Sequence, residues 1–278
     1  MSSPVPQSAP AGWSLARALG HGWAECAAGL ANWRIAHLDG TAILRRRYAR
    51  SALGQFWLTL STGASIAALG AVWTILWKQP AHEIFPYIAV SMVLWGFMNT
   101  LVIEGASAFV NQAHTLSNQG LAVSTFIYSL LYKAVLVLLH DAVIIVLVLL
   151  VFQPPIGLDA WRFVPAFALT LVAGFCVSYL TAMLCARYRD VILLATTLMQ
   201  LMFYVTPVLW RADFLPAQYR WIIQVNPFTA FLSILRDPLL GHPTTAHAWW
   251  YALAATALLL LATLIAAGTV RRRLIYWI

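Results

Sequence analysis

The stretch RYRDVILLATTLMQLMFYVTPVLWRADFLPAQYRWIIQVNP, residues 187–227, decides the fold class of this chain. It opens with three charged residues, Arg187, Arg189 and Asp190, and then runs apolar from residue 191 to residue 210. A helix of about twenty apolar residues extends about 30 Å, which is the thickness of the hydrocarbon core of a bilayer. The stretch therefore predicts a membrane-spanning helix, and the positive-inside rule places its arginine end in the cytoplasm.

The residues beyond this span stay apolar although they are expected on the outer side of the membrane. Residues 213–240 contain Trp221 and are interrupted by Pro216, Pro227 and Pro238. A loop that lies in water is not built in this way. We expect one or two short helices that dip into the outer half of the membrane, which is tolerated where other protein covers the backbone.

The composition of the whole chain is that of a polytopic membrane protein. Hydrophobic residues make up 62% of the 278 residues and charged residues only 9%, far from the balance of a soluble domain. The net charge of +8 does not predict nucleic-acid binding, because the basic residues lie beside apolar spans, where orientation and anionic lipid explain them. The three cysteines form no CxxC motif, so neither a disulfide framework nor a metal site is expected.

Five further apolar segments are long enough to cross a bilayer. They are residues 56–77, 84–109, 126–152, 163–186 and 249–270. Six spans place both termini on one side, and arginines concentrated near the N-terminus, at 187–190 and after Val270 place that side in the cytoplasm. The sequence thus predicts an all-α integral membrane protein with a six-span domain at residues 56–278.

Two segments precede this domain. Residues 1–33 begin with a stretch rich in proline, serine and alanine and are predicted to be flexible. Residues 34–55 alternate apolar residues with arginines, which predicts an amphipathic interface helix on the inner membrane surface. The alternative is a basic flank that only orients the next span.

Ionisable residues inside two spans need partners, because an unpaired charge in a bilayer is costly. Thr100, Glu104, Ser107 and Asn111 fall on one face of the second span, and Lys133 lies in the third span at a similar depth to Glu104. We predict that Glu104 and Lys133 form an ion pair or share a hydrogen-bond network.

The connection between the second and third spans, residues 110–124, is short and polar and contains Gly120. Its composition predicts a short helix on the cytoplasmic surface that could bind a soluble partner. The alternative is an ordinary connecting turn.

Signals of catalysis are absent from the sequence. It contains no GxxxxGK[ST] loop, no GxGxxG and no HExxH motif. Its acidic residues are scattered, so no cluster is expected to hold magnesium against a pyrophosphate. We therefore expect a chain that is not an enzyme, binds no metal or cofactor, and takes energy for any uphill transport from another subunit.

Several short motifs together resemble a known family. They are RYARSALGQFW at 47–57, RYRDV at 187–191, TPV at 206–208, NPF at 226–228 and RRRLIYWI at 271–278. In this order and spacing they resemble the ABC-2 (type V) permeases that form the membrane subunits of bacterial O-antigen, capsule and teichoic-acid exporters. The resemblance extends from about residue 34 onward. Thr206 stands where the family usually has serine.

The resemblance implies a homodimer of six-span subunits in the bacterial inner membrane, with lipid-linked polysaccharide as the substrate. It implies two copies of a cytoplasmic ATPase subunit, which bind ATP and magnesium. It further implies that residues 34–52 form an interface helix, that residues 110–124 form a coupling helix against the ATPase, and that residues 213–240 form gate helices at the outer mouth.

Candidate residues follow for two of these parts and, as a separate prediction, for an inner gate at the cytoplasmic end of the span that begins at residue 191. The outer gate candidates are Pro207, Trp221, Asn226 and Pro227, and the coupling candidates are Asn111, His114, Asn118 and Gln119. The inner gate candidates are Arg187, Arg189 and Asp190, for which ordinary orientation of the span is the alternative.

Aromatic residues bear on the substrate. The chain has 13 tryptophans, 13 phenylalanines and 10 tyrosines, and Trp73, Trp95, Phe97 and Tyr204 lie well inside predicted spans. Sugar rings have apolar faces that pack on aromatic rings, so these four residues are candidates for the channel wall. The alternative for each of them is helix packing or contact with lipid.

Three functions remain open at this point. The first is an exporter subunit for lipid-linked polysaccharide, with the O-antigen type as the leading candidate. The second is an ABC-2 permease that exports a lipid, drug or other small molecule. The third is a membrane enzyme that acts on a polyprenyl carrier, against which the scattered acidic residues argue.

Overall fold

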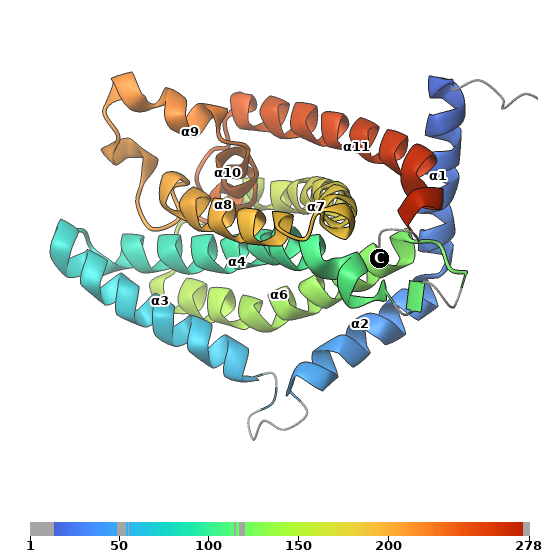
Figure 1. The fold of residues 1–278 in the computed structure, drawn as a ribbon. Coiled ribbons are helices and arrows are strands. Elements are labelled where there is room, and N and C mark those ends of the chain that lie inside the picture. The colour runs from blue at the N-terminus through green and yellow to red at the C-terminus, as the bar shows by residue number, and fades with distance from the viewer. Residues whose placement is uncertain (1–13, 49–53, 55, 114, 117–119, 275–278) are drawn as a thin grey trace, which may run out of the picture.

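The computed structural model describes residues 14–48, 54, 56–113, 115–116 and 120–274, and throughout these residues the regular structure is helical. Within them, five helices are long and apolar enough to cross a membrane. They are α3 (Phe56–Trp77), α4 (Ala81–Asn111), α6 (Ser124–Phe152), α7 (Phe163–Arg187) and α11 (Ala246–Leu274). A short 3₁₀ helix, η1 (Leu158–Arg162), precedes α7. These helices run side by side as the body of the molecule (Figure 1).

The predicted span at residues 191–210 is shorter in the structure. Its helix, α8 (Val191–Val205), has 15 residues and so rises about 22 Å, less than the hydrocarbon core of about 30 Å. The helix ends at Thr206, which adopts an extended backbone conformation with φ −79° and ψ 138°. The cause is Pro207, which disfavours a helical conformation in the residue before it.

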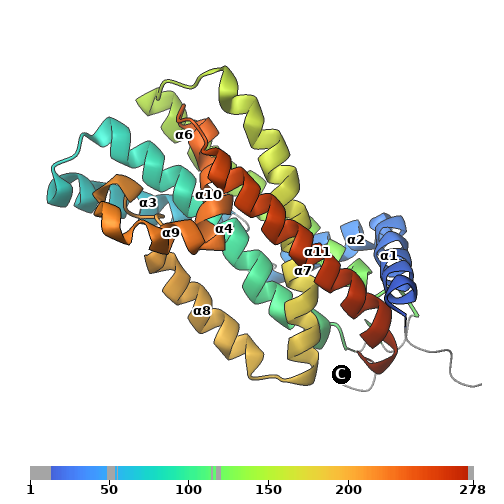
Figure 2. The same cartoon turned by 90° about the horizontal axis from the view of Figure 1, so that it is seen from above.

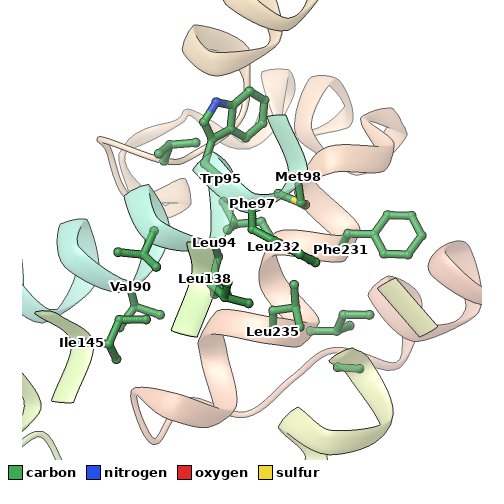
Figure 3. Packing of buried hydrophobic residues seen from close by; sticks show 14 of the residues in the cluster. Val90, Leu94, Trp95, Phe97, Met98, Leu138, Ile145, Phe231, Leu232 and Leu235 are labelled. Atoms are coloured by element: carbon green, nitrogen blue, oxygen red, sulfur yellow. The ribbon is translucent and has the colours of Figure 1, made fainter. Parts of the chain in front are cut away.

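The core of the bundle is centred on α4. This helix packs against α7, α6, α3 and α8, and Figure 3 shows its Leu94, Phe97 and Met98 among side chains of α6 and α10. The α4–α7 contact is close because Gly105 lies directly against Ser178 and leaves no room for a Cβ atom. Ser178 Oγ donates a 2.6 Å hydrogen bond to Leu101 O. Small residues and hydroxyl groups of this kind hold helices together where lipid removes the hydrophobic driving force.

The N-terminal residues form two helices, α1 (Leu15–Ala31) and α2 (Trp33–Tyr48). The prediction that residues 1–33 are flexible is wrong for the part that forms α1, because a stripe of buried residues packs this helix against α11 and α6. Ser14 caps its start by accepting a bond from Arg17 N–H. Helix α2 coincides with much of the predicted interface helix. Figure 1 shows α1 lying across one end of the bundle, which we call the α1 end.

The residues between α8 and α11 form four short helices at the opposite end, the α9 end. They are η2 (Ala212–Phe214), η3 (Ala217–Tyr219), α9 (Trp221–Val225) and α10 (Pro227–Leu239). Helix α10 packs against α11, α7 and α4, so it lies inside the bundle. Helix α11 crosses α7, and α8 runs beside α4 (Figure 2).

Candidate functional site

A buried arginine organises the α9 end of the bundle. Arg236 of α10 is 5% exposed, and its Nη1 lies 2.8 Å from both Tyr87 Oη and Pro207 O and 3.3 Å from Ser91 Oγ. Its Nε and Nη2 each lie 3.0 Å from Asp237 Oδ1. We call these five residues the Arg236 network.

The network joins three parts of the chain. The guanidinium lies over the Tyr87 ring at 4.3 Å from the ring centroid, and Tyr87 Oη lies 2.9 Å from both Pro207 O and Trp210 O. Arg236 therefore connects α10, the first half of α4 and the turn that ends α8. Such a dense set of partners is what a charge needs inside an apolar bundle.

The outer gate candidate Asn226 lies close to this network. It is 6% exposed, and its Oδ1 accepts a 2.9 Å bond from Phe228 N–H, which caps α10. Its Nδ2 donates to Thr206 Oγ1 at 2.9 Å. Pro227 occupies the first position of α10, where its missing N–H and fixed φ are favourable. The structure thus brings Pro207, Asn226 and Pro227 together, whereas Trp221 at the start of α9 is 61% exposed.

A polar cavity of about 440 Å³ lies beside the Arg236 network. Arg211, Gln224, Ser233, His242 and His247 are among the residues that line it. Arg211 pairs with Glu83 at 2.7 Å and with Asp213 at 3.3 Å. The α9 end therefore offers hydrogen-bond donors and acceptors in a recess of the size that small ligands occupy.

The predicted partners Glu104 and Lys133 meet in the structure. Lys133 Nζ forms an ion pair with Glu104 Oε2 between α4 and α6. The Lys133 side chain is 5% exposed and the Glu104 side chain 30%. A cavity of about 540 Å³ borders the pair and reaches Arg46 of α2 and Asn111. Both side chains line this recess, and the carboxylate is the more exposed of the two.

The four aromatic candidates have different surroundings. Trp95 and Phe97 are 6% and 4% exposed, and both pack on neighbouring rings. The ring centroids of Trp95 and Phe203 lie 5.8 Å apart, and those of Phe97 and Phe167 lie 5.7 Å apart. Trp73 is half-buried and stacks on Trp77 at 4.3 Å. Tyr204 is 65% exposed. In a single chain only Tyr204 presents its ring at the surface, so the channel role stays a prediction.

The remaining candidates lie at the α1 end. Arg187, Arg189 and Asp190 are exposed at the turn between α7 and α8, and the Arg187 guanidinium lies 5.3 Å from the centroid of the Tyr188 ring. Asn111 Nδ2 donates to Ser107 Oγ at 3.1 Å. The other coupling candidates, His114, Asn118 and Gln119, lie outside the described residues.

Neither Arg236 nor Tyr87 was among the site residues predicted from the sequence. The available signal was the adjacent pair Arg236 and Asp237 within an apolar segment, because two charges at such a place need buried partners. Tyr87 carries no comparable signal, since tyrosines are common near the ends of membrane spans.

An apolar cleft of about 540 Å³ lies between α4, α7, α10 and α11. Leu101, Val177, Phe231 and Leu258 are among the residues that line it, and Thr170 and Tyr251 are its polar members. With so few hydrogen-bonding groups the cleft suits hydrocarbon rather than a sugar.

Metal-ligating side chains do not gather in the part of the chain that the structure describes. In this part of the chain no group of three or more His, Cys, Asp and Glu side chains could hold a metal ion. Burial, together with the nearby Cys176 and Glu25, raises the pKa of the Cys26 thiol to about 11. The thiol therefore stays protonated near pH 7 and is a poor nucleophile.

Comparison with known proteins gives two findings. The sequence profile of the ABC-2 type transporter family matches residues 41–240. The chain is also similar to the O-antigen export system permease protein RfbA of Klebsiella pneumoniae, with 22% identity over 195 residues, which cover 70% of this chain and 75% of that protein. The family profile begins inside α2, so α1 lies before the matched region.

Proposed function

We propose, since this chain belongs to the ABC-2 type transporter family, that it is the membrane subunit of an ATP-driven exporter of lipid-linked polysaccharide in the bacterial inner membrane. The observation that carries the substrate class is the similarity to a permease named for O-antigen export. The family normally works with an ATPase subunit, and the sequence has no nucleotide-binding motif. We therefore assign ATP and magnesium to a separate cytoplasmic ATPase.

Several features of the chain support a six-span topology with cytoplasmic termini. The five long helices account for five crossings. Helix α8 and the buried residues Thr206, Pro207 and Val208 form the sixth in our proposal, covered by the α10 segment. In this topology the α9 end is the outer end and the α1 end is the cytoplasmic end.

Exposed apolar surface supports a homodimer. Helix α8 packs mainly on α4 within the chain, and its Leu193, Leu194 and Leu201 are 72%, 66% and 56% exposed. Lipid can cover such a face, but a second copy can cover it as well. In the proposed dimer each copy docks one ATPase, the α9 and α10 helices form the outer gate, and Arg187, Arg189 and Asp190 border the inner gate.

Tyr204 is the residue whose channel role can be tested most cleanly. Replacing it with alanine removes an exposed ring, so we expect the melting temperature to stay unchanged while the export rate falls about two- to tenfold, as loss of one aromatic contact predicts. Trp250→Ala is the matched control, because Trp250 is 72% exposed on α11. Equal export by the wild type and Tyr204→Ala would remove Tyr204 from the channel wall. Trp95→Ala is a poor test, because emptying a buried site costs about 3–5 kcal/mol.

The apolar cleft favours a second candidate function, export of a lipid or another apolar small molecule. Vesicles that contain this chain and its ATPase distinguish the two candidates. We expect labelled lipid-linked polysaccharide to cross only with ATP, and not with an ATPase variant that cannot hydrolyse it. Movement of lipid alone would favour the second candidate, and failure of any ATPase to copurify would contradict the exporter assignment.

A further inference from the structure

Helix α1 is bound tightly to the bundle although it lies before the region that matches the family. It contacts α11 and α6. Gly22 lies directly against the Leu264 backbone, and Gly268 lies against the Ala18 backbone, so neither contact leaves room for a Cβ atom. Close backbone contact of this kind depends on small residues. Helix α1 is therefore an integral part of the cytoplasmic end rather than an appended tail.

Helix α1 supplies the cap of α6. The N-cap residue of α6, Val123, has no side chain that can accept a hydrogen bond from the first turn. Glu25 of α1 takes this role, because its Oε1 accepts from Ser124 N–H at 3.3 Å. In return, Ser124 Oγ donates to Glu25 O at 2.7 Å. Glu25 is 2% exposed, and a carboxylate at a helix N-terminus also complements the helix dipole.

Helix α2 holds the opposite end of the same connection. Gln112, the C-cap residue of α4, donates from Nε2 to Asp39 of α2, at 3.1 Å to Oδ2 and 3.4 Å to Oδ1. Between α1 and α2, Asn32 Nδ2 donates to Thr125 Oγ1 at 3.3 Å. The chain thus leaves α4 beside α2 and enters α6 beside α1.

We infer that α1 and α2 form a clamp that fixes both ends of the α4–α6 connection, so that movement of the ATPase is passed to the membrane helices. The inference depends on the proposed function, in which this connection contacts the ATPase. Coupling between distant sites needs packed and hydrogen-bonded elements that move together. A connection whose ends are free would absorb the movement instead. Glu25 and Asp39 are positioning residues in this clamp.

The test uses the full complex of chain and ATPase in vesicles. Glu25→Ala and Asp39→Ala are compared with Glu25→Gln, which keeps an acceptor oxygen for Ser124 N–H. Asp159→Ala is the control, because Asp159 forms an exposed ion pair with Arg162 far from the clamp. The measured quantity is polymer exported per ATP hydrolysed, together with the melting temperature and the amount of copurified ATPase.

We expect Glu25→Ala to lower export per ATP by about fivefold, the factor that corresponds to the loss of one helix cap. Asp39→Ala should lower the same ratio, because it removes the acceptor of Gln112 Nε2. Glu25→Gln should retain most of the wild-type ratio, and Asp159→Ala should retain all of it. An unchanged ratio in both alanine variants would overturn the clamp while leaving the exporter assignment intact. A fall in export and in ATP hydrolysis by the same factor, with a lower melting temperature, would show only structural support and would also overturn it. Failure of the wild-type chain to bind an ATPase would overturn the proposed function and the clamp together.

Discussion

Replacement of Arg236 by leucine is expected to destabilise the chain by about 3–5 kcal/mol, the typical effect of breaking a buried ion pair from one side. The substitution leaves Asp237 without its cation, since its Oδ1 is the atom that Arg236 contacts. It also removes one of the two donors to Pro207 O and a donor to Tyr87 Oη. The hydrogen bonds by which Arg236 joins α10 to α4 and to the turn after α8 are thus lost in one step, while the apolar packing of α10 on α4 remains.

The measurement is the melting temperature of the purified chain in detergent, followed by export in vesicles. Arg220→Leu is the matched control, because Arg220 is an exposed arginine of the same segment, and surface changes of this kind usually have small effects. A double variant with Arg236→Leu and Asp237→Asn should recover part of the loss, because it leaves no unpaired carboxylate. Equal melting temperatures for Arg236→Leu and Arg220→Leu would contradict the role that we assign to the network.

We also expect Arg236→Leu to lower the export rate, for a reason that is separate from the loss of stability. In the proposed function α10 belongs to the outer gate, and the Arg236 network holds this helix against α4. An Arg236→Lys variant keeps the charge but lacks the planar fork that reaches several acceptors at once. We therefore expect Arg236→Lys to be more stable than Arg236→Leu.

The sequence predicted the long helices well because their signal is local. Residues 56–77 coincide with α3, and the other long spans differ by a few residues at their ends. The fifth span was predicted too long, since the composition stays apolar through Trp210 although the backbone leaves the helix before Pro207. Hydropathy predicts which residues are buried away from water, but it does not predict where a helix ends.

The packing of α1 could not be predicted in the same way. Its buried residues are Ala18, Gly22, Glu25 and Gly29, and three of them are small residues that occur as readily in flexible segments. What fixes them is the backbone of α11 and α6, far away in the sequence. Burial of the aromatic candidates also depends on helices that are distant in the sequence. Trp95 and Tyr204 are both aromatic residues within predicted spans, but Trp95 is 6% exposed and Tyr204 is 65% exposed.

The Glu104–Lys133 pair was accessible from the sequence because opposite charges at matched depth in adjacent spans need each other. Its geometry predicts unequal effects for its two members. Glu104→Gln leaves a buried ammonium without its carboxylate, so we expect a loss of about 3–5 kcal/mol. Lys133→Met should cost less, because the Glu104 side chain is 30% exposed, against 5% for Lys133, and has a further interaction.

A double-mutant cycle measures this coupling directly. Melting temperatures of Glu104→Gln, Lys133→Met and the double variant give the interaction energy of the pair. Neighbouring residues typically couple by about 0.5–3 kcal/mol, and we expect about 1–3 kcal/mol for this pair. The exposed pair Glu83 and Arg211, at the other end of α4, is the control and should couple by less than about 1 kcal/mol. The double variant should be more stable than Glu104→Gln alone, because removal of the second charge also removes its desolvation. If Glu104→Gln were harmless while Lys133→Met abolished folding, the lysine would have another essential partner, and the pair would not be the contact that joins α4 to α6.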